Sequence, residues 1–249
     1  MKLENILAKR PTKTVYRDGN KSIKVFNENH SKVDVLSQAL NQAKVETTSI
    51  NIPKILEVTT YDGKWVIVTE YIEGKTLDVL MKEHPEKEDE YLNMFLDLQM
   101  SIHKERVGGL LKIKEKMSNK ISQSNLDDAK KYELHTRLEA MPNHNKVCHG
   151  DFNPTNVILG DDGKLYVIDW SHVTQGNASA DVARTYLLFC LDQGEEMANK
   201  YLDLFCKKSK TDKSYVQKWL PIVAASQSVK NIPEEKELLQ KWTDVIDFQ

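Results

Sequence analysis

Three oxygen-bearing side chains at short, fixed spacing carry the chemistry that this sequence suggests. Asp151 lies in the segment 149–156, Asn156 follows it by five residues, and Asp169 follows it by eighteen. Phosphoryl transfer needs one carboxylate to take a hydroxyl proton and oxygen ligands to hold magnesium on the phosphates. A loop aspartate, an asparagine at the loop's exit and an aspartate after the next hairpin supply these groups. The spacing therefore predicts a magnesium-dependent phosphoryl-transfer site.

A compact hairpin must position two of these residues. Residues 156–159 and 165–169 read as strands, and Asp161-Asp162-Gly163 between them is a turn sequence. Because a hairpin reverses the chain, we expect it to return Asp169 to the neighbourhood of Asn156.

The first seventy residues are predicted to form a small antiparallel sheet with one helix. Two hairpins are expected, one over 14–26 around Asp18-Gly19-Asn20 and one over 55–71 turned at 61–64. Residues 31–47 have helical periodicity. We expect its apolar residues to share the buried face: Val33, Leu36, Leu40, Ala43 and Val45.

The rest of the chain is mainly helical. Helices are predicted over 76–84, 87–105 and much of 112–141, and again from 181 to the end with breaks near Gly194, 207–213 and Pro233. The predicted class is α+β with two lobes. Residues 1–72 would form a nucleotide-binding N-terminal lobe, and residues 73–249 a larger, mainly helical catalytic and substrate-binding lobe.

Composition narrows the possible partners. The net charge of −2, with 29% charged and 40% apolar residues, argues against attraction to nucleic acid or to an anionic membrane by the overall field. The three cysteines are scattered without a CxxC pair, no apolar run approaches the ~20 residues of a membrane span, and the first residues do not resemble a signal peptide. We expect a soluble, cytoplasmic protein. The sequence does not indicate its oligomeric state.

The motifs around these residues resemble those of the aminoglycoside phosphotransferase / choline kinase-like family, small-molecule kinases with a protein-kinase-like fold. The family's HGDxxxxN loop matches His149-Gly150-Asp151 and Asn156, and its IDW motif matches 168–170. The likeness continues through 177–183 and spans most of the chain, from Lys24 to Trp219.

The resemblance implies a role for each matching residue. Asp151 is implied as the catalytic base that deprotonates the acceptor hydroxyl, and Asn156 and Asp169 as magnesium ligands. His149 is implied to brace the loop, as is Asp181. ATP and Mg²⁺ are the implied cofactors, although the sequence does not distinguish ATP from GTP.

The N-terminal lobe agrees with this resemblance. Lys24, in the strand 22–26, is expected to pair with the α- and β-phosphates. Glu70 and Ile72 resemble the hinge that reads the adenine edge. The phosphate-covering turn lies between 10 and 19, where Thr12 and Thr14, with Lys13 between them, offer backbone and hydroxyl donors.

One position departs from the family pattern. A glutamate on the small-lobe helix normally pairs with the strand lysine, and the matching position here is Gln38. A glutamine hydrogen-bonds an ammonium without neutralising it. We therefore expect Lys24 to be held less firmly, or to be held by Glu46.

The acceptor is expected to be a small hydroxyl compound. Only twelve residues separate Asp169 from Asp181, which leaves no room for the activation segment on which protein substrates dock. Acidic residues after the next helix would suit a cationic acceptor, such as an aminoglycoside, choline or an amino alcohol: Asp192, Glu195 and Glu196.

The sequence leaves two alternatives to an active kinase. Gln38 and the glycine-poor phosphate loop would suit a pseudokinase that binds nucleotide without turnover. His149 and Asp151 with later aspartates would suit a two-metal phosphoesterase, but His135, His144 and His172 form no compact motif.

Overall fold

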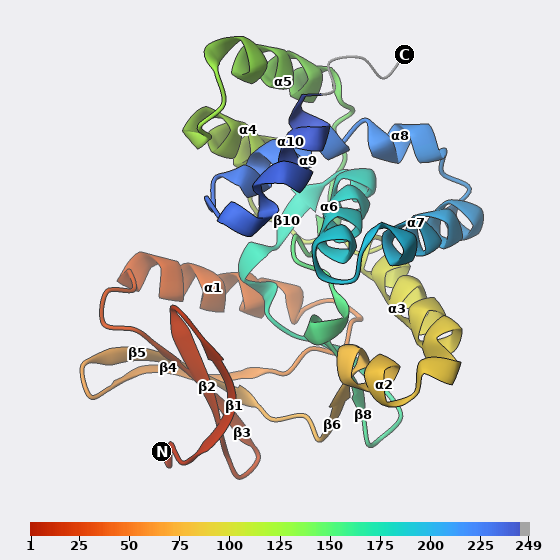
Figure 1. Cartoon of the computed structure of the whole chain (residues 1–249). Helices are drawn as coiled ribbons and strands as arrows, with labels where there is room; N and C mark the ends of the chain where they lie inside the picture. Colours follow the sequence, from red (N-terminus) through yellow and green to blue (C-terminus); the bar gives the residue numbers. More distant parts are fainter. Residues whose placement is uncertain (245–249) are drawn as a thin grey trace. The chain divides into compact units, whose positions relative to one another are not determined.

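The computed structural model describes residues 1–244 (Figure 1). The chain divides by its internal contacts into two compact units, each described by itself. Unit 1 comprises Met1–Tyr91 and Pro154–His172, and unit 2 comprises Leu92–Asn153 and Val173 onward. The predicted α+β class is confirmed, with an antiparallel sheet near the N-terminus and helices predominating later.

Unit 1 is built on a five-stranded antiparallel sheet. Its strands are β1 (Asn5–Arg10), β2 (Lys13–Asp18), β3 (Lys21–Phe26), β4 (Ile55–Tyr61) and β5 (Lys64–Glu70). Their order in the sheet is β1-β2-β3-β5-β4, and all pairings are antiparallel. Gly19, at φ 59°, makes the predicted turn between β2 and β3 possible, because a side chain would disfavour that backbone conformation. Both hairpins were predicted, but β1 was not.

The helix α1 (Lys32–Val45) packs on one face of this sheet. Val35 and Ala39 of α1 are buried against Phe26 and Ile67, whereas the opposite face of the sheet gathers Ile23, Val25, Val66 and Val68. The predicted buried face of the helix is therefore partly wrong. Val33, Leu36 and Leu40 are 70%, 42% and 56% exposed, because the sheet covers the narrower stripe of smaller residues on the other side.

A second, three-stranded sheet in unit 1 has the order β6-β8-β9. Its strands are β6 (Gly74–Thr76), β8 (Val157–Gly160) and β9 (Leu165–Val167). Unit 1 also contains α2 (Leu77–Glu83) and four short or boundary elements: η1 (Pro85–Lys87), η2 (Pro154–Asn156), η3 (Trp170–His172) and the first turn of α3 (Glu88–Ile102). Strands β8 and β9 form the predicted hairpin.

Unit 2 is mainly helical. It contains most of α3, then α4 (Ile113–Gln123), α5 (Asp128–Ala140), α6 (Ala178–Asp192), α7 (Glu195–Ser209), α8 (Lys213–Gln217), α9 (Leu220–Ser228), η4 (Pro233–Glu235) and α10 (Lys236–Thr243). A two-stranded antiparallel ladder joins β7 (Lys146–Cys148) to β10 (Thr174–Gly176).

Aromatic side chains form much of the core of unit 2. Phe95 of α3 stacks on Phe152 at 4.3 Å between ring centroids and meets Phe189 and Tyr201 edge-on. Each such ring buries a large apolar area, and the pair geometry adds ~0.5–1.5 kcal/mol per contact. The core therefore places the residue after Asp151 firmly against α3.

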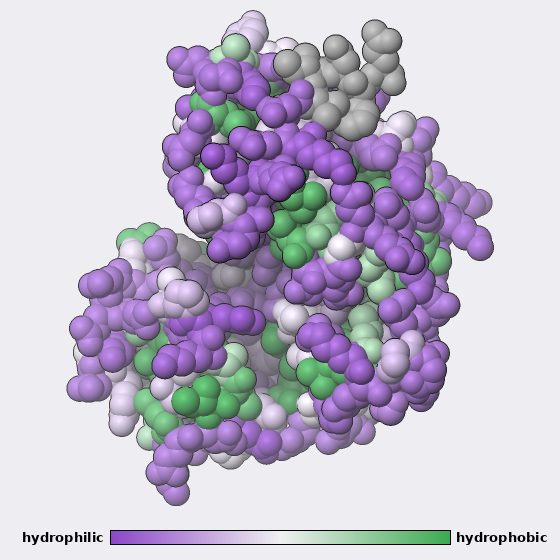
Figure 2. All heavy atoms as spheres, viewed as in Figure 1, coloured by the Kyte–Doolittle hydropathy of each residue, from purple (hydrophilic) through white to green (hydrophobic). Residues whose placement is uncertain are grey.

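The surface visible in Figure 2 is dominated by hydrophilic residues, with apolar patches between them. Among residues 1–244, no helix has the length and apolar character needed to cross a membrane.

Candidate functional site

In unit 1, Asp169 directly follows the hairpin that was expected to position it. Val157 pairs with Val167, and the Ile168 N–H donates to the Asn156 carbonyl at 3.0 Å. Asn156 and Asp169 are therefore held at the same end of the hairpin. Asp169 has a φ of 60°, in the left-handed region that aspartate tolerates better than most residues.

Two lysines bind the Asp169 carboxylate. Lys13 Nζ lies 2.9 Å from Oδ2, and Lys24 Nζ lies 3.3 Å from Oδ1. Burial alone would raise the pKa of this carboxyl, but the charges and hydrogen bonds of Lys24 and Lys13 hold the pKa well below its usual range. Burial lowers the pKa of Lys24, and the neighbouring Lys13 lowers it further against the opposing effect of Asp169.

The strand register explains why these two lysines meet. Lys24 pairs with Val15 across β2 and β3, and Lys13 pairs with Phe26. Cross-strand partners share a face, and residues two apart in a strand also share a face. Lys13 and Lys24 are therefore diagonal neighbours on the face that α1 covers. The ammonium of Lys13 was not predicted to contribute, although this register could have indicated it.

The position that departs from the family pattern has no ionic role in the structure. Gln38 lines a small cavity of about 350 Å³ with Thr12, Lys13 and His30, and its Oε1 accepts no hydrogen bond from any of residues 1–244. Glu46 Oε1 instead accepts from the Ile55 N–H at 2.8 Å. Lys24 thus forms its ion pair with Asp169 and not with Glu46 of the helix end or with Gln38.

The other residues that were predicted to contact the nucleotide are distributed along the five-stranded sheet and its connections. Thr12 lies in the β1–β2 turn, and its carbonyl accepts from the Asn27 N–H at 3.0 Å. Thr14 pairs with Val25, which places it on the sheet face opposite Lys24. Glu70 ends β5 and exchanges hydrogen bonds with the backbone of Lys54, while Ile72 follows the strand.

In unit 2, the loop that carries Asp151 is braced by a buried carboxylate. Asp181, 1% exposed, accepts from the Gly150 N–H at 2.7 Å and from the His149 N–H at 3.3 Å, and it contacts His103 Nε2 at 3.0 Å. Burial would raise the pKa of Asp181, but the hydrogen bond and charge of His103 and the Gly150 N–H keep it below the usual value. The loop geometry thus depends on one charged acceptor.

His149 also supports this loop. It is fully buried, and its Nδ1 accepts from the Asp151 N–H at 3.2 Å. The next residue, Gly150, has a φ of 80°, a conformation that a larger residue would adopt only with strain. His149 and Asp181 together therefore fix the backbone on both sides of Gly150.

A chain of buried hydrogen bonds holds the following residue. Tyr201 Oη donates to Gln99 Oε1 at 2.6 Å, Gln99 Nε2 donates to Thr185 Oγ1 at 3.1 Å, and Thr185 Oγ1 donates to the Phe152 carbonyl at 2.9 Å. Such fully satisfied networks rigidify their surroundings. Sequence reasoning missed this chain because its members are far apart in the sequence.

A guanidinium lies beside Asp151. Arg184 Nη2 is 3.7 Å from Asp151 Oδ1, and the two side chains are 13% and 27% exposed. Arg184 comes one helical turn after Asp181 on α6, so the same helix braces the loop and presents a cation to its carboxylate. Arg184 was also not predicted.

The acidic residues predicted to contact a cationic acceptor lie elsewhere in unit 2. Asp192 ends α6, about 12 Å along the helix from Arg184. Glu195 and Glu196 are exposed in the first turn of α7, and Glu195 forms an ion pair with Lys241 at 2.5 Å. The structure does not bring these three residues to Asp151.

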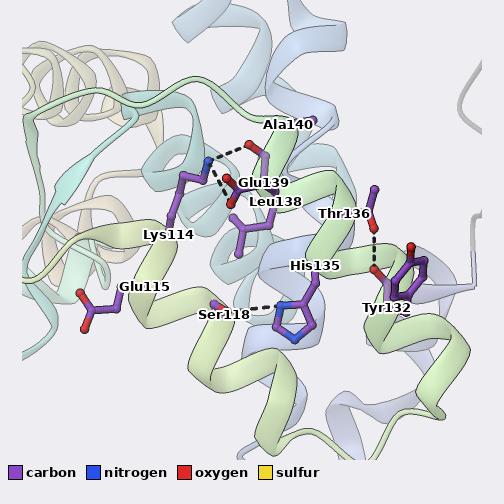
Figure 3. A pocket seen from close by; sticks show the side chains of 9 residues that line it. All are labelled: Lys114, Glu115, Ser118, Tyr132, His135, Thr136, Leu138, Glu139 and Ala140. Atoms are coloured by element: carbon purple, nitrogen blue, oxygen red, sulfur yellow. Dashed lines mark hydrogen bonds and ion pairs between the residues drawn. The ribbon is translucent and has the colours of Figure 1, made fainter.

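A separate hollow of about 780 Å³ lies between α4 and α5 (Figure 3). Its side chains bond mainly to one another. His135 contacts Ser118 at 3.3 Å, and Lys114 Nζ donates to the Glu139 and Met141 carbonyls. These contacts link α4 to α5 and to the segment that follows it.

The chain contains no group of three or more His, Cys, Asp or Glu side chains placed to hold a metal within residues 1–244. Asp169 and Asn156 nevertheless offer two oxygen donors at one end of a hairpin. This donor set fits Mg²⁺, which binds one or two protein oxygens and completes its octahedron with phosphates and water.

Comparison with known proteins is consistent with this chemistry. The family model described as "Phosphotransferase enzyme family" matches residues 14–219. No curated protein matches the sequence significantly.

Solved structures share the fold. A thermostable mutant of aminoglycoside phosphotransferase APH(4)-Ia, in a ternary complex with AMP-PNP and hygromycin B, is 16% identical over 97% of this chain and 91% of its own, with a TM-score of 0.68. Choline kinase LicA from Streptococcus pneumoniae is 15% identical over 94% of this chain and 87% of its own, with a TM-score of 0.61. Aminoglycoside-3'-phosphotransferase of type VIII is 16% identical over 91% of this chain and 92% of its own, with a TM-score of 0.65. At these identities the likeness establishes the fold, and it confirms the predicted protein-kinase-like architecture.

Proposed function

Since this chain belongs to the phosphotransferase enzyme family, we propose that it transfers the γ-phosphoryl group of ATP to a hydroxyl of a small molecule, with Mg²⁺ as cofactor. The proposal depends on the Asp169 carboxylate. Asp169 comes after the hairpin that Asn156 precedes, and its carboxylate is bound by two ammonium groups. A site that binds a triphosphate needs cationic side chains close to a residue that can bind a metal ion.

Residues 1–72 would bind the nucleotide. Lys24, and Lys13 beside it, would move from Asp169 to the phosphate oxygens, which are stronger acceptors with more charge. The β1–β2 turn with Thr12 and Thr14 would cover the phosphates, and the backbone near Glu70 and Ile72 would contact the adenine. Gln38 would stay near the lysines without neutralising them.

Asp169 and Asn156 would hold the metal. When bound, Mg²⁺ would neutralise charge on the phosphate oxygens. Asp169 has the low pKa that a permanently ionised ligand needs. Its lysine partners have flexible stems and can leave it without breaking the fold.

Asp151 would act as the general base. The acceptor oxygen attacks the γ-phosphorus, the bond from that phosphorus to the bridging oxygen of ADP breaks, and the hydroxyl proton passes to the Asp151 carboxylate. His149 and Asp181 would keep the Asp151 backbone in place for this step. General-base assistance is typically worth ~10²–10⁴-fold, and the rest of the acceleration comes from positioning and charge stabilisation.

Two finer expectations belong to the same proposal. We place the enzyme in the cytoplasm, where its three free cysteine thiols, Cys148, Cys190 and Cys206, would stay reduced. Its partners would be nucleotide and a small-molecule acceptor, not nucleic acid or membrane.

The test combines nucleotide binding with turnover. ATP with magnesium should raise the melting temperature of the wild-type protein, and ATP without magnesium should raise it less. Asp151→Asn should keep the ATP-magnesium shift while losing ~10²–10⁴-fold in turnover. Asp97→Asn, which changes an aspartate that is 65% exposed on α3, is the matched control and should retain both. The proposal fails if ATP with magnesium gives no shift and no ADP is formed with any hydroxyl acceptor.

A further inference from the structure

One face of helix α6 lies against the loop that carries Asp151. Arg184 and Thr185 follow Asp181 by three and four residues, so the three share one side of the helix. Asp181 and Thr185 bind the loop backbone on either side of Asp151. Arg184, on the same face, places its Nη2 3.7 Å from Asp151 Oδ1. This face of α6 therefore binds the loop backbone and also holds a guanidinium beside the carboxylate.

A neighbouring helix binds the second terminal nitrogen of this guanidinium. Arg184 Nη1 donates to Gln227 Oε1 at 2.6 Å. Gln227 lies on α9, which packs against α6 (Figure 1), and it is 2% exposed. A buried amide that turned away would leave polar groups without hydrogen bonds, which is costly. Gln227 therefore fixes the direction in which the guanidinium points.

The hydrogen bonds continue from Gln227 to a carboxylate. Gln227 Nε2 donates to Glu235 Oε2 at 2.6 Å, and Glu235 is the last residue of the short helix η4. The amide thus accepts from a cation and donates to an anion, so both of its hydrogen bonds are charge-assisted. Arg184, Gln227 and Glu235 together are called the arginine relay below.

The guanidinium needs these partners because it is largely buried. The Arg184 side chain is 13% exposed. Burial lowers its pKa, and the charges of Asp151, Glu235 and Asp181 act in the opposite direction. An arginine stays protonated at neutral pH. The arginine relay therefore keeps a permanent positive charge at a fixed position beside Asp151.

A general base needs this kind of support for its side chain. Its carboxylate oxygen must lie within hydrogen-bond reach of the acceptor hydroxyl and point toward it. The Asp151 side chain is 27% exposed, and contacts to the loop backbone do not restrict rotation about its side-chain bonds. A planar guanidinium that is itself held by other groups restricts the carboxylate that pairs with it.

We propose that Arg184 is a positioning residue for the Asp151 carboxylate, and that Gln227 and Glu235 hold Arg184 for this task. This inference rests on the proposed function and extends it from the loop to the segment that follows α9. It makes turnover depend on Glu235, which acts on Asp151 through Gln227 and Arg184.

Kinetics of relay variants test the proposal. Turnover is measured as ADP formed with whichever of choline, ethanolamine, glycerol and hygromycin B gives the highest wild-type rate, and with water alone. Arg184→Gln should lower kcat about tenfold and leave KM for ATP unchanged, because it removes a charge-assisted contact to the general base. A rise in KM for ATP with unchanged kcat would assign Arg184 to the nucleotide phosphates and overturn the proposal.

Glu235→Gln is the second variant, and it leaves both Arg184 and Gln227 in the protein. It should lower kcat about threefold with unchanged KM for ATP, because the relay loses its terminal charge but keeps the guanidinium. Glu234→Gln, at the exposed preceding residue of η4, is the matched control and should behave as wild type. If Glu235→Gln kept the wild-type kcat, the relay would not support catalysis.

A double-mutant cycle shows whether Arg184 acts through Asp151. Arg184→Gln should cost about tenfold in kcat in the wild-type background but less than about twofold in the Asp151→Asn background, since no charged base remains to be positioned. A purely structural effect would cost the same in both backgrounds. A further tenfold loss in the Asp151→Asn background would therefore overturn the proposal.

The failure of this inference is distinguishable from failure of the proposed function. If the wild type binds ATP with magnesium and forms ADP, but Arg184→Gln keeps the wild-type kcat, the kinase assignment stands and the positioning role is rejected. If the wild type neither binds ATP with magnesium nor forms ADP, the kinase assignment and the positioning role both fail.

Discussion

Two aspartates, one in each unit, have the same side chain but are bound by different kinds of groups. Asp169 of unit 1 is 26% exposed and is bound by two lysine side chains. Asp181 of unit 2 is 1% exposed and is bound by His103 and by the backbone N–H groups of His149 and Gly150. Both carboxyl groups have a pKa below the usual value, for different reasons.

The difference lies in how easily the partners can leave. The ammonium group of a lysine is carried on a flexible side chain, so moving it to another partner costs little free energy. Backbone N–H groups can leave only if the loop itself changes conformation. Asp169 is thus suited to exchange its partners for a metal ion, and Asp181 is suited to stay fixed. A low pKa alone does not distinguish a carboxylate that can bind a metal ion from one that fixes a loop. The groups that bind the carboxylate do distinguish the two.

The largest expected effect is on function, at Asp169. Asp169→Asn should lose ~10³-fold or more in turnover, because an amide is a weaker and uncharged ligand for Mg²⁺. The magnesium-dependent part of the ATP thermal shift should disappear with it, and the melting temperature without nucleotide should also fall, because Lys13 and Lys24 lose their carboxylate partner. Steady-state kinetics and thermal shift with and without magnesium measure these effects.

Asp161→Asn, at the turn of the same hairpin, is the control for Asp169. It should retain both turnover and the magnesium dependence. If Asp169→Asn kept its magnesium-dependent ATP shift, Asp169 would be a structural partner of the lysines, and the contrast with Asp181 would collapse.

At Asp181 the larger effect should be on stability. Asp181→Asn should lower the free energy of unfolding by about 3 kcal/mol, because it removes a buried charge that several donors share. Asp192→Asn, at the exposed end of the same helix, should change it by less than ~0.5 kcal/mol. Urea unfolding at pH 7 measures both.

The free energy of unfolding at low pH provides a second test of the role of Asp181. Asp181 has a folded pKa below its unfolded value of ~3.9, so its stabilisation is present above pH ~3.9 and is lost as the pH falls through the folded pKa. The stability difference between wild type and Asp181→Asn should therefore shrink below pH 4. A difference that stayed constant down to pH 2 would mean that the ionised form is not what braces the loop.

The third effect compares the two lysines that bind Asp169. Lys24→Gln and Lys13→Gln should each raise KM for ATP about tenfold, since each removes one charge-assisted bond to the phosphates. Neither should alter KM for the acceptor. Lys21→Gln, exposed at the start of β3, is the control and should behave as wild type. An unchanged KM in Lys13→Gln would restrict Lys13 to pairing with Asp169 in the nucleotide-free protein.

The local motifs predicted that Asn156 and Asp169 lie at one end of a hairpin, because that geometry is local. Asn156 and Asp169 bracket one hairpin, whose turn sequence and length are readable from neighbouring residues. The pairing of Lys13 with Asp169 and the position of Arg184 beside Asp151 were missed because nothing in their own segments indicates these partners. Lys13 meets Asp169 across 156 positions of sequence, and only the sheet register brings it there.

The helix α1 shows the corresponding limit for the fold. Its position and length were predicted from periodicity, but the buried face was assigned to the larger apolar residues. The structure buries Val35 and Ala39 and exposes Val33, Leu36 and Leu40. Both stripes have helical spacing, and which one is covered depends on the space that the sheet leaves for side chains. That space is a tertiary property that a single segment does not encode.

The smallest expected effect concerns Lys116 of α4, whose pKa is lowered mainly by burial, with the charges of Lys120 and Arg184 acting in the same direction. Its folded pKa of about 7 lies below the unfolded value of ~10.4. Below pH 7 both states are protonated and the folded state carries the full cost of the buried charge. As the pH rises from 7 to ~10.4 the unfolded state binds more protons than the folded state, so the free energy of unfolding of the wild type should rise.

Lys116→Met should therefore stabilise the protein by about 1 kcal/mol at pH 6, and this gain should shrink by pH 9.5. Urea unfolding at the two pH values measures the change, with the exposed Lys218→Met as control. Destabilisation at pH 6 would show that the protonated Lys116 side chain makes a net favourable contribution to the folded state.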